Sequence, residues 1–447
     1  MVSAAEQLAS NLNLNAFAKA EDLKKRLWFT LGALIVFRLG TFIPLPGINP
    51  AAFAETFKTQ SGGILGMFNM FSGGALERLA IFALNIMPYI SASIIMQLMS
   101  SINPKLEALK KEGEAGRKQI NQYTRYLTVI LAALQAYGIA VGLEGSKNAA
   151  GAVVIDPGMF FRATTVITLV GGTMFLMWLG EQITQRGVGN GTSLIIFAGI
   201  VAGLPGALVQ LFELSRTGAL SPLLLVFFIA LALSVIAAIV FFERAQRRLL
   251  VQYPKRQVGN KMFQGDASHL PLKLNSSGVI PPIFASSLLL LPITVAQFTA
   301  GQGPDWLGSI TTALGAGQPM HMLVYALLIL FFAFFYTAVV INPKETADNL
   351  RKYGGFLPGI RPGEKTAEFI DYVLTRITLV GALYLAVVCV LPEVLTSYAG
   401  IPLYFGGTSL LIAVSVTMDT VAQVQSHLIA QQYEGLIKKA KLRGSKK

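Results

Sequence analysis

Long apolar stretches separated by short polar segments dominate the pattern of this chain. No charged residue interrupts the segments 79–104, 187–212, 217–242 and 274–304. A helix of about 20 mostly apolar residues crosses a hydrocarbon core of about 30 Å, and each of these segments is long enough. A soluble fold would need many wholly apolar helices inside one domain, so the pattern indicates a helical membrane protein.

The complete pattern predicts an all-α, polytopic protein with ten membrane-spanning helices. Arg38 interrupts the first span, and a short Gly-rich apolar segment, 61–74, precedes the second. The predicted spans are 27–46, 76–101, 124–143, 161–181, 190–212, 219–242, 276–298, 320–341, 375–396 and 405–425.

Ten spans divide naturally into five plus five, and many transport folds pair two such halves around a pathway. The two halves share no clear sequence identity, so this division rests on the number of spans alone. The expected units are a cytoplasmic N-terminal segment 1–23, an N-terminal half 24–213, a C-terminal half 214–428 and a basic tail 429–447.

Charge sets the expected orientation of these spans. The composition is 53% hydrophobic and only 13% charged, whereas soluble domains carry about 25% charged residues. The net charge is +13, and 30 of the 36 Lys and Arg residues lie in the termini, in the loops after even-numbered spans, or at the adjoining starts of spans three and nine (Arg125 and Arg376). Because positive residues accumulate on the cytoplasmic side, both termini and these loops are predicted to be cytoplasmic.

Two of the cytoplasmic loops, 243–275 and 342–375, are much longer than connections of about 4–6 residues. The positive-inside bias accounts for part of their charge but not for their length. We expect a docking surface for an anionic partner such as ribosomal RNA or an acidic protein patch. The candidate docking residues are Arg247, Arg248, Lys255, Arg256, Arg351, Lys352 and Arg361.

The sequence contains no recognisable catalytic or cofactor motif. Neither HExxH, GxSxG nor a phosphate-binding glycine loop occurs. The three histidines, His269, His321 and His427, are not at ligand spacing, and the only cysteine, Cys389, has no partner for an internal disulfide. The N-terminus lacks a signal-peptide cleavage pattern. We therefore expect no enzyme activity, no metal and no cofactor.

Acidic residues inside membrane spans usually mark ion-coupled transport. Here Glu181, Glu393 and Asp419 lie close to the ends of predicted spans, and no span has a central Asp or Glu. This distribution argues against a proton-driven transporter. Transport of a small solute without ion coupling stays open as an alternative, and an intramembrane enzyme is a more remote one.

Four strings carry a more specific signal. They are IFALNIMPYISASIIMQLM (81–99), WLGEQITQRGVGNGTSLIIFAGI (178–200), GVIPPIFASS (278–287) and YFGGTSLLIAV (404–414). Together they resemble the SecY family, the pore subunits of the bacterial Sec translocon. MFNMFSGGALER, SHLPLK, NPKETADNL, PGIRPGE and TLVGALY extend the resemblance over nearly the whole chain.

The resemblance implies a protein-conducting channel in the bacterial plasma (inner) membrane that passes unfolded preproteins and releases transmembrane segments sideways into lipid. It implies an hourglass pore between the halves, narrowed by a ring of apolar side chains that disfavours ions. The ring positions carried over by motif are Ile86, Ile90, Thr192, Ile196, Ile283 and Ile412. Thr192 departs from the aliphatic residue of the family pattern, and Asn85 replaces an expected glycine.

The resemblance also implies a plug, a lateral gate and a set of partners. The gate would open between spans two and three on one side and spans seven and eight on the other. The plug positions are Ile64, Leu65, Met67, Phe68, Asn69, Met70 and Phe71, and the gate positions are Ser91, Ser93, Gln97, Ser286 and Ser287. The expected partners are SecE, SecG, the SecA ATPase, the ribosome, preproteins with their signal peptides, membrane lipids, SecDF and YidC.

Overall fold

A computed structural model describes residues 20–49, 52–53, 57, 69, 71–144, 147–148, 151–218, 221–253, 256–258, 261–263, 267–298, 313, 315, 318–399 and 407–444. Within these residues the chain is mainly helical, with three short antiparallel hairpins. The hairpins pair β1 (Lys147–Asn148) with β2 (Gly151–Ala152), β3 (Gln246–Gln252) with β6 (Ala267–Lys273), and β4 (Arg256–Val258) with β5 (Lys261–Phe263).

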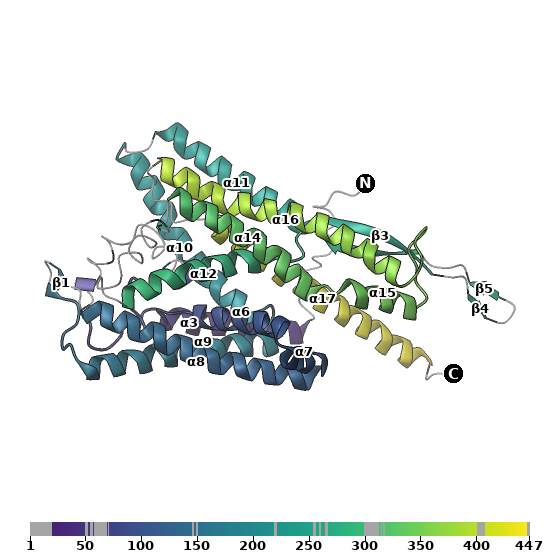
Figure 1. The fold of residues 1–447 in the computed structure, drawn as a ribbon, viewed down its shortest axis with the longest axis horizontal. Helices are drawn as coiled ribbons and strands as arrows, with labels where there is room; N and C mark the ends of the chain where they lie inside the picture. Colours follow the sequence, from purple (N-terminus) through teal and green to yellow (C-terminus); the bar gives the residue numbers. More distant parts are fainter. Residues whose placement is uncertain are drawn as a thin grey trace.

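The helices follow the predicted spans closely (Figure 1). The first half contains α3 (Glu21–Gly40), α6 (Met87–Ile102), α7 (Pro104–Lys111), α8 (Glu114–Glu144), α9 (Met159–Arg186) and α10 (Gly191–Arg216). The second half contains α11 (Pro222–Arg244), α12 (Ile280–Phe298), α14 (Pro319–Val340), α15 (Pro343–Lys352), α16 (Glu364–Ala399) and α17 (Gly407–Gly444).

Seven of the described helical segments are long and apolar enough to cross a membrane. Two shorter apolar helices, Met87–Ile102 and Ile280–Leu289, lie within the second and seventh predicted spans. Helix α3 overlaps the first predicted span over residues 27–40, and the prediction of a helical, polytopic fold is confirmed.

Side-chain caps explain where several helices begin. Asn190 accepts hydrogen bonds from the N–H groups of the first turn of α10, and Asn342 does the same for α15. Asn103 caps α7, and Ser221 caps α11. Each cap satisfies main-chain donors that have no partner within their own helix. The polar residues between the apolar runs therefore fix the helix starts.

The second predicted span is only partly helical, and the prediction of one helix over 76–101 is wrong for its first half. The chain from Ser72 to Ile86 forms consecutive turns, and α6 starts at Met87. Leu79 and Asn85 have φ angles of 42° and 50°, which no α-helix accommodates. The main chain pairs instead with the end of the first span, where Leu45 N–H donates to Leu79 O at 3.0 Å.

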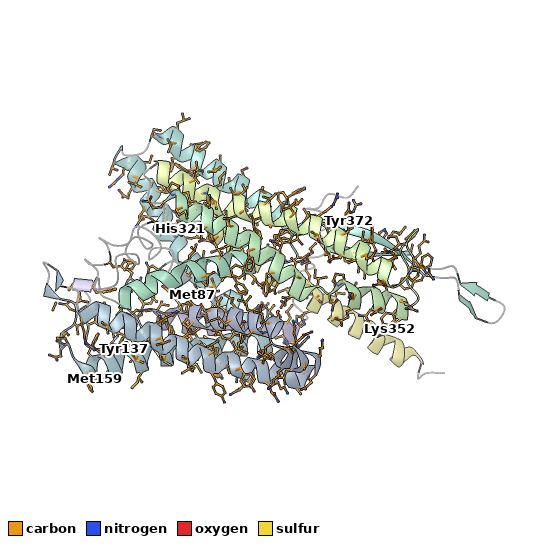
Figure 2. All side chains as sticks on the ribbon, viewed as in Figure 1. Met87, Tyr137, Met159, His321, Lys352 and Tyr372 are labelled. Atoms are coloured by element: carbon orange, nitrogen blue, oxygen red, sulfur yellow. The ribbon has the colours of Figure 1, made fainter. Side chains whose placement is uncertain are left out.

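The elements of the two long basic loops lie toward one end of the molecule. In Figure 1 the labels α7, α15 and β3 lie toward one end of the molecule, and β1 lies at the opposite end. Figure 2 places Lys352 and Tyr372 toward the first end, with Tyr137 and Met159 at the other. The two long basic loops therefore lie at the same end of the helical bundle.

The two halves meet along two seams. On one side α12 packs against α6 and α8, and on the other α17 packs against α10 and α3. A large cluster of buried apolar side chains lies where elements of both halves converge, and a second cluster lies within the first half. The central cluster is therefore shared by the two halves.

Candidate functional site

The central apolar cluster brings together residues that are far apart in the sequence. Four of the six predicted ring residues are buried in it, and Ile283 of α12 packs against it while partly buried. We define the waist cluster as Phe71, Ile86, Ile90, Ile196, Ile200, Ile283 and Ile412. Its side chains come from α6, α10, α12, α17 and the chain before the second span, so it is shared by both halves.

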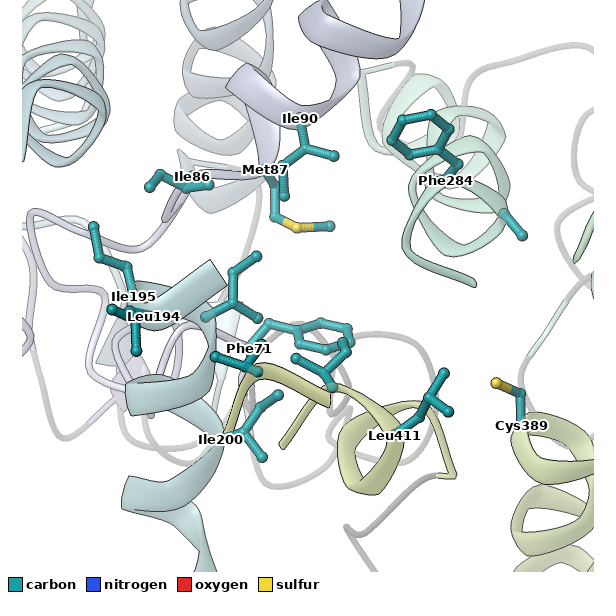
Figure 3. Close-up of a cluster of buried hydrophobic side chains, with 14 of the residues drawn as sticks. Phe71, Ile86, Met87, Ile90, Leu194, Ile195, Ile200, Phe284, Cys389 and Leu411 are labelled. Carbon is teal, nitrogen blue, oxygen red and sulfur yellow. The ribbon is translucent and has the colours of Figure 1, made fainter. Parts of the chain in front are cut away.

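Phe71 belongs to this cluster and is only 4% exposed. Figure 3 shows its ring among the labelled side chains of the cluster, with Ile86, Met87 and Ile90 on one side and Ile200 and Leu411 on the other. Of the predicted plug residues, Phe71 and Asn69 are described, whereas Ile64, Leu65, Met67, Phe68 and Met70 lie outside the described residues.

Thr192 occupies a different position from the other predicted ring residues. It lies in the first turn of α10, is half-buried, and its N–H donates to Asn190 Oδ1 at 3.1 Å. Ile196 and Ile200 follow on the same face of α10 at spacings of four and are buried in the cluster. Thr192 is thus half-buried at the start of the helix, and Ile200 is a buried residue of the same face that the sequence prediction did not name.

The motif at 187–191, which is part of the second characteristic string, forms a close junction between four helices, α3, α9, α10 and α17. A Cβ atom on Gly191 would lie 1.9 Å from Gly180 O, so α9 and α10 approach at a distance that only glycine permits. Thr30 Oγ1 of α3 accepts from Val188 N–H at 3.1 Å. Gln423 Oε1 of α17 accepts from Gly189 N–H at 2.9 Å, which ties the second half to the first.

The predicted gate residues lie on helices that are packed together. Ser91, Ser93 and Gln97 are partly buried on α6, and Gln97 Nε2 donates to Ser93 Oγ at 3.4 Å. Ser286 and Ser287 are buried on α12, and both hydroxyls donate to Ile283 O, at 2.9 and 2.8 Å. These hydrogen bonds stay within one helix, so they do not oppose separation of α6 from α12.

The two basic loops form one structural unit. Gln252 of β3 and Phe356 exchange two main-chain hydrogen bonds of 2.9 Å. Leu249, Leu272, Leu357, Ile370 and Leu374 are buried together in a small core below the hairpin. The candidate docking residues Arg247, Arg248, Arg351, Lys352 and Arg361 are all exposed; Arg256 lies on β4, and Lys255 lies outside the described residues.

Two of the acids near the span ends, Glu181 and Glu393, lie close to a basic side chain of another helix. Arg125 of α8 donates to both carboxylate oxygens of Glu181 on α9, at 2.7 to 3.1 Å. His321 is buried, with its Nε2 atom 3.4 Å from Glu393 Oε1. No cluster of three or more metal-ligating side chains occurs in the described part of the chain. These acids join helices, which is a structural use of intramembrane charge.

Comparison with protein-family models matches residues 80–421 to the family described as SecY. The chain belongs to the SecY family. It is 58% identical over 422 residues to the protein translocase subunit SecY of Rickettsia conorii, covering 94% of this chain and 97% of that protein. It is 56% identical over 424 residues to the same subunit of Escherichia coli K12, covering 95% and 96%.

Solved structures similar to this SecY-family chain share its fold at low sequence identity. One, titled as the structure of a protein conducting channel, has a TM-score of 0.65 at 18% identity, covering 91% of this chain and 92% of that one. Sec61 in a canine ribosome-channel complex has a TM-score of 0.63 at 17% identity, with the same coverage. The resemblance stated from the motifs is therefore confirmed for family and fold.

Proposed function

We propose that this SecY-family protein conducts unfolded polypeptides through the waist cluster and that the cluster seals the pathway when no polypeptide occupies it. The observation that carries the proposal is the convergence of buried isoleucines from both halves at one place between the seams. Related proteins named protein translocase subunit SecY and a similar structure titled as a protein conducting channel support it.

The chemistry of the waist cluster suits a seal around a passing chain. Isoleucine side chains offer no hydrogen bond to water or ions, and an apolar constriction blocks ions by excluding water. They also offer no specific contact to a polypeptide, so many sequences can pass. The ring of this proposal contains Ile86, Ile90, Ile196, Ile283 and Ile412 from the sequence prediction and adds Ile200, with Thr192 half-buried at the start of α10.

The seam between α6 and α12 is the proposed route into lipid. The gate residues of the two helices bond within their own helices, so opening the seam breaks mainly apolar contacts. A polypeptide segment at an open seam would then partition by transfer free energy. Leu or Phe favours lipid by about 0.3–0.6 kcal/mol each, and a central Lys or Asp costs about 2.5–3.5 kcal/mol.

The joined basic loops are the proposed docking surface for the partner that drives or delivers the polypeptide. Solved structures of similar fold are described with ribosomes, which supports the ribosome as one partner. The SecA ATPase, SecE and SecG are the further partners that we propose from the family resemblance. The positive end of the protein would face the cytoplasm of a bacterium, and the protein would span the inner membrane with both termini inside.

Reconstitution tests the proposal directly. Vesicles that contain this protein with SecE, and receive SecA, ATP and a secretory preprotein, are expected to protect the preprotein from added protease. Omission of ATP is the control and should abolish protection. Absence of protection together with saturable uptake of a small solute would instead favour the transporter alternative.

A further inference from the structure

The short segment Phe71–Gly73 is held by side chains from two other parts of the first half. Asn85 Nδ2 donates a hydrogen bond to Phe71 O, and Arg38 Nη1 donates one to Gly73 O. Phe71 itself is buried in the waist cluster, at the meeting point of both halves. The two donors therefore fix the main chain on either side of Ser72 while the Phe71 ring occupies the waist.

Asn85 is suited to this contact by its backbone conformation. Its φ angle of 50° lies in the left-handed region, where glycine is unstrained and asparagine is the side chain tolerated best. Of these two residues, only asparagine has a side chain that can donate a hydrogen bond. The side chain is 1% exposed, and its Oδ1 atom has no hydrogen-bond partner among the described residues. The chain thus keeps a buried, half-satisfied amide where glycine would fit.

Arg38 reaches the same segment from the last turn of α3. Its guanidinium lies 4.8 Å from the centre of the Phe42 ring, and Arg78 lies 4.1 Å from the same ring. An arginine within an apolar span needs acceptors, because an unpaired charge there is costly. Gly73 O is one such acceptor, and Thr41 Oγ1 is a second, 3.4 Å from Arg38 Nη1. Moving the segment away would leave Arg38 with fewer acceptors.

Helix α10 makes the third contact with the segment Phe71–Gly73. A Cβ atom on Gly199 would lie 2.4 Å from Phe71 O and 3.2 Å from Gly73 N. The main chain of the segment therefore lies directly against the backbone of α10. All three contacts, from Arg38, Asn85 and Gly199, belong to the first half. Separation of the two halves alone leaves these contacts intact.

We propose that Asn85 and Arg38 are positioning residues that retain Phe71 in the waist cluster and so set the threshold for opening the channel. The inference rests on the proposed function, since it assigns a role within the seal. Opening then requires loss of two hydrogen bonds in addition to separation of the halves. A typical single hydrogen bond corresponds to about a fivefold change in an equilibrium constant, and one from a charged donor to more than about tenfold.

The test measures ion conductance of the full-length protein, with its small membrane partners, in planar lipid bilayers without a translocating polypeptide. Asn85→Gly removes the donor but keeps the left-handed backbone free of strain. We expect the ion conductance without a translocating polypeptide, called the idle conductance, to rise about fivefold. The midpoint of thermal unfolding should not fall, because the substitution also removes a buried amide that has only one of its hydrogen-bonding groups satisfied. Asn85→Ala, which adds strain, should raise conductance and lower the midpoint.

Arg38 supplies a rescue experiment. Arg38→Met should raise idle conductance more than Asn85→Gly, and Arg38→Lys, which retains a donor, should return it toward the original value. The positioning role would be overturned if Arg38→Met and Arg38→Lys had the same idle conductance and the same fall in unfolding midpoint.

The control for an open waist is the double variant Ile86→Gly and Ile283→Gly. If that variant conducts while Asn85→Gly stays at the original conductance, the inference about Asn85 is wrong and the seal survives. If neither variant conducts, the proposed seal itself is wrong.

Discussion

Gln252 and Phe356 exchange two main-chain hydrogen bonds of 2.9 Å, which join two loops that are about 100 residues apart in the sequence. The contact extends hairpin β3–β6 into the second loop and places Arg247, Arg248 and Arg361 on one structural unit. A docking partner would therefore meet a single folded surface whose stability depends on the small core beneath it.

Neighbouring leucines on β3 test the dependence of this surface on its core. Leu249 is buried in the core, whereas Leu250 is 38% exposed on the other face of the strand. Leu249→Ala is expected to lower the local free energy of unfolding by about 2–5 kcal/mol. Leu250→Ala is expected to change it by no more than about 0.5 kcal/mol. Limited proteolysis of the loops measures the difference. Equal protease sensitivity in the two variants would contradict a core-supported surface.

Charge reversal at two exposed arginines of β3 tests the electrostatic role of this surface. Arg247→Glu with Arg248→Glu should weaken binding to an anionic partner and reduce the dependence of affinity on salt, because fewer counterions are released. Binding to purified ribosomes at two salt concentrations is the measurement. The matched control, with the same change in net charge, is Lys110→Glu with Lys111→Glu on α7, at a separate exposed site. An equal loss in the control would mean that net charge, and not this surface, governs binding.

Removal of apolar side chains from the waist tests the seal. Burial of one isoleucine side chain is worth about 1.5–3 kcal/mol, so loss of two should raise the open probability by more than about tenfold. The double variant Ile86→Gly and Ile283→Gly is expected to leak ions in planar bilayers. Ile167 of α9 is 72% exposed, and Ile167→Gly should leave conductance unchanged. Similar ion leaks from the double variant and from Ile167→Gly would contradict the assignment of Ile86 and Ile283 to the seal.

Two glycines of α10 differ in the space around them and test the packing of the 187–191 junction. A Cβ on Gly191 would overlap Gly180 O, whereas a Cβ on Gly203 would meet nothing within 4 Å. Gly191→Ala is expected to destabilise the protein by about 1–3 kcal/mol, and Gly203→Ala to be neutral or stabilising by up to about 1 kcal/mol. Thermal unfolding in detergent distinguishes them, and equal midpoints would argue against close contact of α9 with α10.

The ion pair between Arg125 and Glu181 tests whether intramembrane charge is structural here. Both side chains are partly exposed, so loss of the pair through Arg125→Ala should cost only about 1–2 kcal/mol. The double exchange Arg125→Glu with Glu181→Arg should recover most of that loss in thermal unfolding. A double variant as unstable as the sum of the two single changes would show that the residues act separately.

Hydrophobic pattern predicts the spans because each must exclude charge over the thickness of a membrane, and this property is local. The first half of span two was mispredicted because its residues are apolar enough for a helix, yet its backbone pairs with residues 43–45 and reverses at Leu79 and Asn85. Such pairing depends on chain segments about 35 residues apart, which no local pattern reports.

The sequence motifs predicted several isoleucines of the candidate site, but not how these residues are arranged in space. Spacing of four along α10 identifies one face, but the sequence does not say where along that face the two halves meet. The structure places Thr192 at the start of the helix and buries Ile200 in the same cluster as Ile86 and Ile412. The contact between Gln252 and Phe356 was unpredictable because both residues make it through main-chain atoms.

Cross-linking from the waist to a stalled preprotein tests the central claim most directly. A photoreactive amino acid is placed singly at Ile86, Ile196 or Ile412 and, as lipid-facing controls, at Ile167 or Leu233. The account predicts adducts with the preprotein from all three waist positions and from neither control. Adducts from the controls alone, with none from the waist, would contradict passage of the polypeptide between the two halves.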